Sequence, residues 1–438
     1  MDGWTIAGYN PLMETGMKPP HHISAGIRQV VACGIVGLLA LVPLWGPGSH
    51  ATTGHASRGG PPAVGALLRT VAVAPAPLAL VADAPTERVF VFSSSAHDSR
   101  VTVLEARTGR VVGARDLGPE AYVPTSDGQP VAAVDARTGR VFVPTSRQSA
   151  ATGAPSGPGR LWVLDGRTGA VRAVRAVGVA PQAVALDAGT RHLFVLDGDT
   201  TLRIIDAAAG RPLRTVPRIG GSAVAADSAT GRLFVANGPE VDVLTTAAGA
   251  VRRRVSVTNS QVQEDALALA VDASGGRVVV GLTDATGLPD GRVLDARTGA
   301  VLYGSRALST PLAVDMATDR IVAVATPLSS SGGDITAAIL VGRTGRVLRA
   351  PVLDRTTSEG GTAVDAVDAR TRHAIVVTSH SSAIADLVSV LDTHSGRLVR
   401  QFTLGAGPPA VAVDEQTGRV FVANAGDDTV SMLDATRL

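Results

Sequence analysis

Asp135-Ala-Arg-Thr-Gly-Arg-Val141 is one copy of a phrase, D-x-x-T-G-R-V, that recurs along this chain of 438 residues. Two close copies begin at Asp227, where the final residue is Leu, and at Asp414. Looser copies begin at Asp83, Asp187, Asp272, Asp315 and Asp368. A unit of roughly 40–50 residues that repeats and contains short strands is typical of sheets arranged in a ring or a solenoid. The repeat therefore decides the fold, although it names no activity.

A second phrase, L-D-x-x-[TS]-G, lies between the copies of the first. It is complete at Leu164–Gly169, Leu294–Gly299 and Leu391–Gly396, and it is degenerate around residues 105, 206, 245, 342 and 434. In both phrases the Asp side chain can accept hydrogen bonds from backbone N–H groups further on, and Gly supplies a positive φ. We therefore interpret the repeated Asp as a turn former and not as a ligand of a metal or substrate.

Residues 409–434 show how one repeat makes one small sheet. The apolar run 410–413 precedes the turn, 419–423 follows it, and 429–433 forms a third apolar stretch. β-Branched and aromatic residues between turn residues predict strands. In most copies Ala stands two positions before the turn Asp, as expected where the innermost strands crowd around an axis.

The eight copies predict an all-β fold, a single closed β-propeller of eight four-stranded blades, with seven blades as the alternative if one copy is degenerate. The last copy ends after its third strand at Leu438. Residues 66–74 parallel residues 397–404, the outer strand one repeat earlier. We therefore predict that this N-terminal strand completes the last blade and closes the ring, which removes exposed sheet edges.

The N-terminal residues are predicted to carry the chain out of the cytoplasm. An apolar run of about 16 residues from Val30 to Trp45 follows Lys18 and Arg28, and Ala51 ends a candidate cleavage site. The run is a signal peptide if it is cleaved and a single-pass signal anchor if it is retained. The predicted organisation is a targeting region at 1–28, the apolar segment at 29–47, a flexible linker at 48–65 and the propeller at 66–438.

Composition and missing motifs exclude several classes of function. A net charge of +2 and an aromatic content of 3% do not favour nucleic-acid binding. Cys33, the single cysteine, lies in the apolar segment, so the propeller has no disulfide. The sequence contains no H-E-x-x-H, G-x-S-x-G, P-loop or C-x-x-C-H motif. It therefore assigns no catalytic residue, metal site or cofactor.

Six residues are candidates for binding at the mouth of the central channel: Asp365, Glu264, Asp265, Glu359, Asn237 and Asn424. Asp365 stands three positions before its turn Asp, where the other copies carry Leu, Ala or Val. A buried carboxylate is costly unless it is paired. A channel-side ligand group is one interpretation of Asp365, and a local register shift or an arginine partner is the preferred explanation. Glu264, Asp265 and Glu359 could line the channel mouth, although solvated loop charge is the preferred interpretation of each.

The remaining connections vary in length and are expected on one face of the ring, because the turns of a meander alternate between two faces. The extended ones span residues 144–159, 256–265, 281–291, 325–336 and 351–361. Binding residues concentrate in variable loops on a rigid scaffold. We hypothesise that a protein or small-molecule partner binds on this loop face and at the channel mouth.

Residues 405–424, Gly-Ala-Gly-Pro-Pro-Ala-Val-Ala-Val-Asp-Glu-Gln-Thr-Gly-Arg-Val-Phe-Val-Ala-Asn, resemble the YVTN-type (YncE-like) bacterial β-propeller repeat. Leu233-Phe-Val-Ala-Asn237 is a second copy of the signature. The resemblance covers about residues 66–438 and implies a secreted, periplasmic or surface-attached protein. Most copies lack the signature Asn, and propellers of this family usually have seven blades, so the resemblance implies the fold and not an activity.

Three functions stay open at this point. The first is a secreted or membrane-tethered propeller, expected to be a monomer, that binds a partner through its variable loops. The second is a metal-dependent lactonase- or lyase-like enzyme with its site at the channel mouth. The third, an accessory subunit of an envelope redox enzyme, rests on analogy of fold alone.

Overall fold

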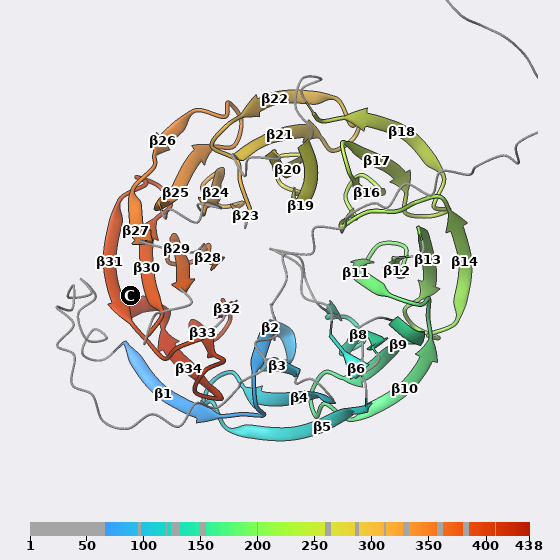
Figure 1. Cartoon of the computed structure of the whole chain (residues 1–438), viewed down its shortest axis with the longest axis horizontal. Coiled ribbons are helices and arrows are strands. Elements are labelled where there is room, and N and C mark those ends of the chain that lie inside the picture. The colour runs from blue at the N-terminus through green and yellow to red at the C-terminus, as the bar shows by residue number, and fades with distance from the viewer. Residues whose placement is uncertain are drawn as a thin grey trace, which may run out of the picture. The chain divides into compact units, whose positions relative to one another are not determined.

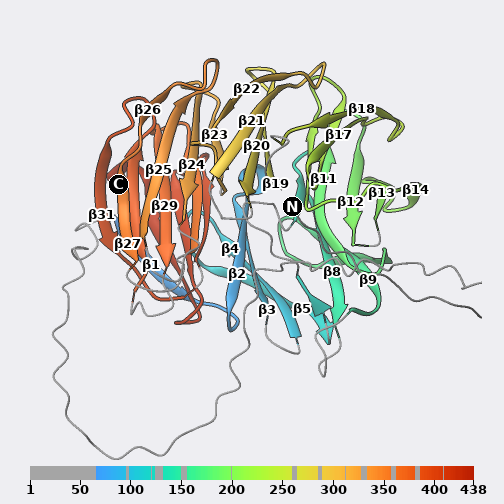
Figure 2. The same cartoon turned by 45° about the horizontal axis from the view of Figure 1, so that its top comes forward.

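The computed structural model describes residues 66–94, 98–119, 121–123, 132–148, 155–198, 200–258, 264–284, 289–310, 312–326, 333–356, 362–379, 385–407 and 409–438. These residues form eight antiparallel β-sheets, which are arranged as the blades of a ring (Figure 1). Figure 2 shows the sheets side by side around this ring. The predicted β-propeller of eight blades is confirmed, and the alternative of seven blades is wrong.

Within each blade the strands are named a to d from the centre of the ring to its rim. In chain order, blades 1 to 4 are built as follows: β2 (Pro77–Asp83), β3 (Arg88–Ser94), β4 (Asp98–Glu105) and β5 (Val111–Pro119); β6 (Ala121–Tyr122), β7 (Ala133–Asp135), β8 (Arg140–Gln148), β9 (Pro155–Asp165) and β10 (Val171–Ala176); β11 (Pro181–Asp187), β12 (His192–Asp197), β13 (Thr201–Asp206) and β14 (Pro212–Pro217); β15 (Ala223–Asp227), β16 (Arg232–Asn237), β17 (Glu240–Thr245) and β18 (Val251–Ser256).

Blades 5 to 8 follow the same scheme: β19 (Glu264–Asp272), β20 (Arg277–Asp284), β21 (Pro289–Asp295) and β22 (Val301–Ser305); β23 (Leu312–Asp315), β24 (Arg320–Ala325), β25 (Gly333–Val341), β26 (Val347–Arg349) and β27 (Val352–Thr356); β28 (Thr362–Asp368), β29 (His373–Ser379), β30 (Leu387–Asp392) and β31 (Leu398–Thr403); β32 (Pro409–Asp414), β33 (Arg419–Asn424), β34 (Thr429–Asp434) and, at the rim, β1 (Leu67–Ala72).

Blades 2 and 6 contain a fifth strand because one of their four strands is divided. In blade 2 both β6 and β7 pair with β8, so together they form the inner strand. In blade 6 both β26 and β27 pair with β25, so together they form the rim strand. Pro351 lies between these last two strands, where its missing N–H interrupts the ladder.

The N-terminal strand closes the ring as the sequence predicted. β1 pairs antiparallel with β34, the third strand of the last blade, from Ala72↔Thr429 to Leu67↔Leu433. The side chain of Val71 points into the apolar cluster between blades 8 and 1, together with Phe421 and Met432. Residues from both ends of the chain therefore share one sheet and one part of the core.

The core lies between the blades. Among the described residues, buried apolar side chains form eight clusters, one at each boundary between neighbouring blades. The third residue of strand b is fully buried in every blade, and in five of them it is Phe: Phe90, Phe142, Phe194, Phe234 and Phe421. All seven phenylalanines are buried. The phenylalanine rings are thus used for packing.

Helical structure in the described ranges is limited to two 3-10 turns, η1 (Ala84–Thr86) and η2 (Ala435–Arg437). Neither is long or apolar enough to cross a bilayer, and the same holds for every helix of the part that the structure describes. The apolar segment at 29–47, predicted as a signal peptide or anchor, lies outside that part.

Closure by β1 predicts that the last blade depends on Val71. Replacement of Val71 by Asp places a charge in an apolar cluster, and we expect the free energy of unfolding to fall by more than about 3 kcal/mol. Thr70→Asp, on the exposed side of the same strand, is the matched control and should change stability by less than about 1 kcal/mol. Urea unfolding followed by circular dichroism measures both, and equal losses in the two variants would contradict closure by this strand.

Candidate functional site

The repeated Asp residues hold the turns between strands a and b. All eight are buried, with 0–5% of their surface exposed. In six blades the carboxylate accepts a hydrogen bond from the N–H two residues on, at 2.9–3.1 Å. In five blades the Thr three residues on donates its hydroxyl to the same carboxylate at 2.6–2.9 Å. The interpretation of these residues as turn formers is confirmed.

A second bond joins the two turns of each blade. The residue after the last residue of strand c donates its N–H to the carbonyl of the residue before strand b, as Gly166 does to Gly139 at 2.7 Å. The same bond is present in all eight blades. The a–b and c–d turns of every blade therefore lie together, and they make up what we term the turn face of the ring.

Arginine side chains form hydrogen bonds between the turns of one blade and the next. In four blades an Arg of strand d donates to a carbonyl that follows strand c of the next blade, in a c–d turn or, in blade 8, in η2; the pairs are Arg69–Thr108, Arg214–Ala248, Arg253–Thr298 and Arg400–Arg437, at 3.0–3.5 Å. Arg140 of strand b donates to the carbonyls of Ala207 and Ala208 in the next blade. The turn face is thus tied together around the ring.

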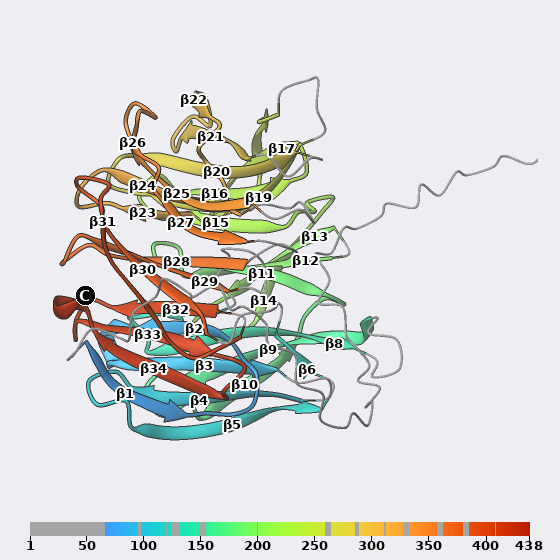
Figure 3. The same cartoon turned by 60° about the vertical axis from the view of Figure 1, so that its left-hand side comes forward.

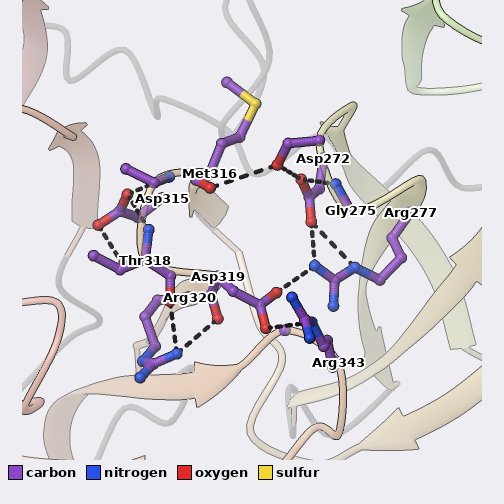
Figure 4. Close-up of polar contacts among 12 residues, drawn as sticks. Asp272, Gly275, Arg277, Asp315, Met316, Thr318, Asp319, Arg320 and Arg343 are labelled. Atoms are coloured by element: carbon purple, nitrogen blue, oxygen red, sulfur yellow. Dashed lines mark hydrogen bonds and ion pairs between the residues drawn. The ribbon is translucent and has the colours of Figure 1, made fainter.

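The boundary between blades 5 and 6 departs from this pattern (Figure 4). Tyr303 of β22 donates its hydroxyl to the carbonyl of Gly342, and burial raises the pKa of Tyr303 to about 12, so the donor stays protonated. Beside it, Arg277 of β20 forms ion pairs with both Asp272 and Asp319. Arg277 is 6% exposed, and its Nη1 atom is inaccessible to solvent and has no hydrogen-bond partner.

Asp319 stands at the fifth position of the turn phrase, which is Gly in four of the eight copies, and we did not predict its role from the sequence. Its φ of 57° is the left-handed conformation that favours Gly. The carboxylate joins Arg277 of blade 5 to Arg343 of its own blade, whose Nε lies 3.5 Å away. The replaced Gly was the available signal, because a strained position is retained where the side chain forms essential contacts.

A shallow cleft of about 550 Å³ opens beside this ion-pair cluster on the turn face. Met316 and Leu302 line it and are 53% and 50% exposed, so its wall combines apolar and charged side chains. Arg277 is already engaged by two carboxylates and Arg343 by one. The arrangement therefore acts first as a lock between two blades.

Loss of Arg277 is predicted to weaken this lock strongly. Arg277→Met leaves the buried Asp272 without its cation and Asp319 with the exposed Arg343 alone, and we expect a loss of about 3–5 kcal/mol in the free energy of unfolding. Arg343→Met removes an exposed partner of the same Asp319 and should cost less than about 1 kcal/mol. Denaturant unfolding compares the two, and a similar small effect for both would show that Arg277 does not hold the blades together.

Asp365 lies in β28, which borders the centre of the ring in Figure 1. Its strand pairs with β29 in continuous register, and Asp365 faces Val376, so a register shift does not explain the carboxylate. Its counterparts are apolar and pack against the preceding blade: Leu80, Ala132, Val184, Val224, Leu269, Leu312 and Val411. No ion pair joins Asp365 to another described residue, and its Oδ2 atom is buried without a hydrogen-bond partner.

Burial raises the pKa of Asp365 to about 7, although the residue as a whole is partly exposed. The folded chain therefore keeps this proton up to about pH 7, whereas an ordinary Asp loses it near pH 4. The stability that the protonated side chain contributes is complete below about pH 4 and is lost as the pH rises towards 7. A role for Asp365 in ligand binding stays a prediction.

The pH dependence of stability tests this environment. We expect Asp365→Asn to gain about 1–2 kcal/mol relative to the unaltered chain between pH 5 and pH 8, after allowance for water that reaches the side chain. Asp116→Asn, in the exposed ion pair on β5, is the control and should give a difference that does not change over this range. Urea midpoints at both pH values provide the measurement. A constant difference for Asp365→Asn would show that its carboxyl titrates as in water.

The two candidate Asn residues lie at the ends of strand b, away from the turn face. Asn424 donates its Nδ2 to the hydroxyls of Thr429 at 2.9 Å and Ser431 at 3.0 Å. Asn237 donates to the carboxylate of Asp242 at 3.2 Å. Each Asn therefore fastens strand b to strand c within its own blade, and a ligand role for either stays a prediction.

The structure describes the backbone of two of the other acidic candidates and no part of the third. Glu264 and Asp265 begin β19 and pair with Asp284 and Thr283 of β20, but their side chains are not among those described. Glu359 lies outside the described ranges. Among the side chains that the structure does describe, no three His, Cys, Asp or Glu residues are placed to hold a metal ion.

The face opposite the turns is irregular, and we term it the loop face. β8 and β9 contain 9 and 11 residues and stay paired out to Gln148↔Pro155, whereas β12 and β13 contain six each. In blade 6, β25 and β27 pair out to Gly333↔Thr356. Figure 3 shows β8 reaching far towards the loop side. Tips at 149–154, 259–263, 285–288, 327–332 and 357–361 are not part of the described structure.

Comparison with solved structures shows the class of fold. BamB from Moraxella catarrhalis has 16% sequence identity and a TM-score of 0.55, covering 84% of this chain and 99% of that chain. The C-terminal WD40 domain of Sif2 has 10% identity and a TM-score of 0.60, covering 84% and 99%. Hydrazine synthase from Kuenenia stuttgartiensis has 16% identity and a TM-score of 0.52, covering 72% and 97%.

These similarities establish an eight-bladed β-propeller and nothing more specific. No model of a known protein family matches the chain, and no curated protein matches it. The resemblance to the YVTN-type repeat therefore remains a prediction from the sequence.

Proposed function

We propose that this chain is an extracytoplasmic β-propeller of the YVTN type that binds a protein partner through its loop face. Export would depend on the apolar segment at 29–47, acting as a cleaved signal or as a membrane anchor, and the linker at 48–65 would separate it from the propeller. The propeller itself would act as a monomeric binding scaffold without a cofactor.

The observation that carries the proposal is the contrast between the two faces. On the turn face, eight equivalent hydrogen bonds and buried Asp residues leave little freedom for the chain to vary. On the loop face, strands of blades 2, 5 and 6 extend beyond those of blades 3 and 4. Variable loops that project from a rigid scaffold are where recognition residues concentrate.

Shortening one extended hairpin tests the proposal. Replacement of residues 148–156 by Asn-Gly joins Arg147 to Gly157, which already face each other across the ladder, through a two-residue turn. The partner is first identified by chemical cross-linking of the intact chain in its own cell envelope and mass spectrometry. We expect its affinity to fall by about 10-fold or more in the shortened variant, because a recognition loop is lost.

The matched control lies on the other face of the same blade. Arg137→Ala with Arg167→Ala alters two exposed turn residues of blade 2, and this variant should bind the partner as the unaltered chain does. Cross-links confined to the turn face, or a larger loss of binding in the control than in the shortened hairpin, would contradict the proposal.

A further inference from the structure

The charge of the propeller is distributed unevenly around the ring, although the whole chain is nearly neutral. Residues 132–258, which form blades 3 and 4 and all of blade 2 except β6, contain sixteen arginines and nine acidic residues, a formal charge of +7. Residues 259–438, which form blades 5 to 7 and most of blade 8, contain fifteen arginines and twenty acidic residues. One arc of the ring is therefore cationic and the opposite arc is not.

Many carboxylates of blades 2 to 4 are buried, so fewer negative charges than positive charges lie at the surface of these blades. Five of the nine acidic residues are at most 5% exposed: Asp135, Asp187, Asp197, Asp227 and Asp242. Three of these hold a–b turns, and the other two pair with Arg203 and Arg254. The exposed surface of this arc is thus more cationic than its formal charge.

The excess is concentrated on three neighbouring rim strands and the residues beside them. β10, β14 and β18 contain no acidic residue. They and their flanks expose eight arginines: Arg172, Arg175, Arg211, Arg214, Arg218, Arg252, Arg253 and Arg254. Figure 1 shows these strands following one another along the same side of the ring. We term this surface the arginine rim.

Most of the arginine rim lacks a carboxylate partner. Arg172, Arg211 and Arg254 form ion pairs with Asp165, Asp206 and Asp242. The other five form none with any described residue, and three of them donate only to backbone carbonyls. These five guanidinium groups are spread over three blades: Arg175, Arg214, Arg218, Arg252 and Arg253.

Protection of sheet edges does not account for this distribution. Charged residues on edge strands discourage pairing with other chains, and all eight rim strands are edges that need it. β22, the rim strand of blade 5, nevertheless contains no charged residue. Edge protection would require charge on every rim strand, whereas β22 has none and the rim strands of blades 3 and 4, with the residues beside them, have three arginines each.

We propose that the arginine rim binds an acidic, extended segment of a partner protein. Planar guanidinium groups bind carboxylates through paired hydrogen bonds. Eight blades share one full turn, so neighbouring rim strands face directions about 45° apart. A flexible chain can follow this convex arc and reach all three blades, whereas a flat membrane meets mainly one of them. The surface is separate from the loop face, so this proposal does not depend on the function proposed above.

The test measures binding of fluorescently labelled poly-L-glutamate to the full chain by anisotropy, at low and at raised salt. The variant Arg175→Gln/Arg218→Gln/Arg252→Gln removes one rim arginine from each of the three blades. None of these three arginines forms a hydrogen bond to another blade among the described residues, so the variant should keep its fold. Thermal unfolding checks this. We expect binding to weaken about 10-fold or more and to become less sensitive to salt.

The control removes the same charge from the opposite arc. Arg306→Gln/Arg346→Gln/Arg397→Gln alters exposed arginines of blades 5, 6 and 7 that form no ion pair with described residues, and it should change the affinity less than about 2-fold. The triple Arg→Lys variant of the rim should bind more weakly than the unaltered chain and more tightly than the Gln variant, since it keeps the charge but loses the paired hydrogen bonds. Equal losses in the two Gln triples would overturn the proposal, because only net charge would then matter. Binding to phosphatidylglycerol vesicles or heparin without binding to poly-L-glutamate would overturn it too.

Discussion

The buried Asp of the D-x-x-T-G turn is the constraint on which the rest of the propeller depends. A carboxylate that is removed from water is costly unless donors surround it, and here backbone N–H groups and the Thr hydroxyl provide them. The turn that results places strand b beside strand a in one register and brings the c–d turn against it. Because the same local sequence repeats eight times, the same geometry repeats eight times and the ring closes.

The fold could be predicted from the sequence because each determinant is local. The turn phrase, the Ala near the axis and the likeness of residues 66–74 to a rim strand are all visible in a short window. The lock formed by Arg277 and Asp319 was not visible, because these residues are 42 positions apart and meet only across a blade boundary. Asp365 was recognised by its departure from the repeat, but the sequence could not show that its register is regular.

The loss of the signature Asn from most repeats follows from a substitution of partners. In blade 8, Asn424 at the end of strand b bonds to Ser431 at the third position of the ladder on strand c. In blade 3 the same two positions hold Asp197 and Arg203, which form an ion pair. In blade 2 Thr145 accepts from the Trp162 indole at 3.1 Å. The structure requires a pair of polar side chains at this place, and several pairs meet the requirement. The signature Asn can therefore be replaced while the hairpin is retained.

This division explains how one scaffold can carry different surfaces. Bonds between the turns of adjacent blades hold the ring from one face, so the opposite face can lengthen its hairpins without disturbing the closure. The rim is less constrained: its side chains at alternate positions face solvent, and apart from arginines such as Arg214 and Arg253, which donate to turns of the next blade, the turn network does not determine their charge. An uneven charge along such a rim is therefore not a consequence of folding. This charge is therefore an observation in favour of the proposed acidic partner, whereas the buried carboxylates are explained by the turns that they hold.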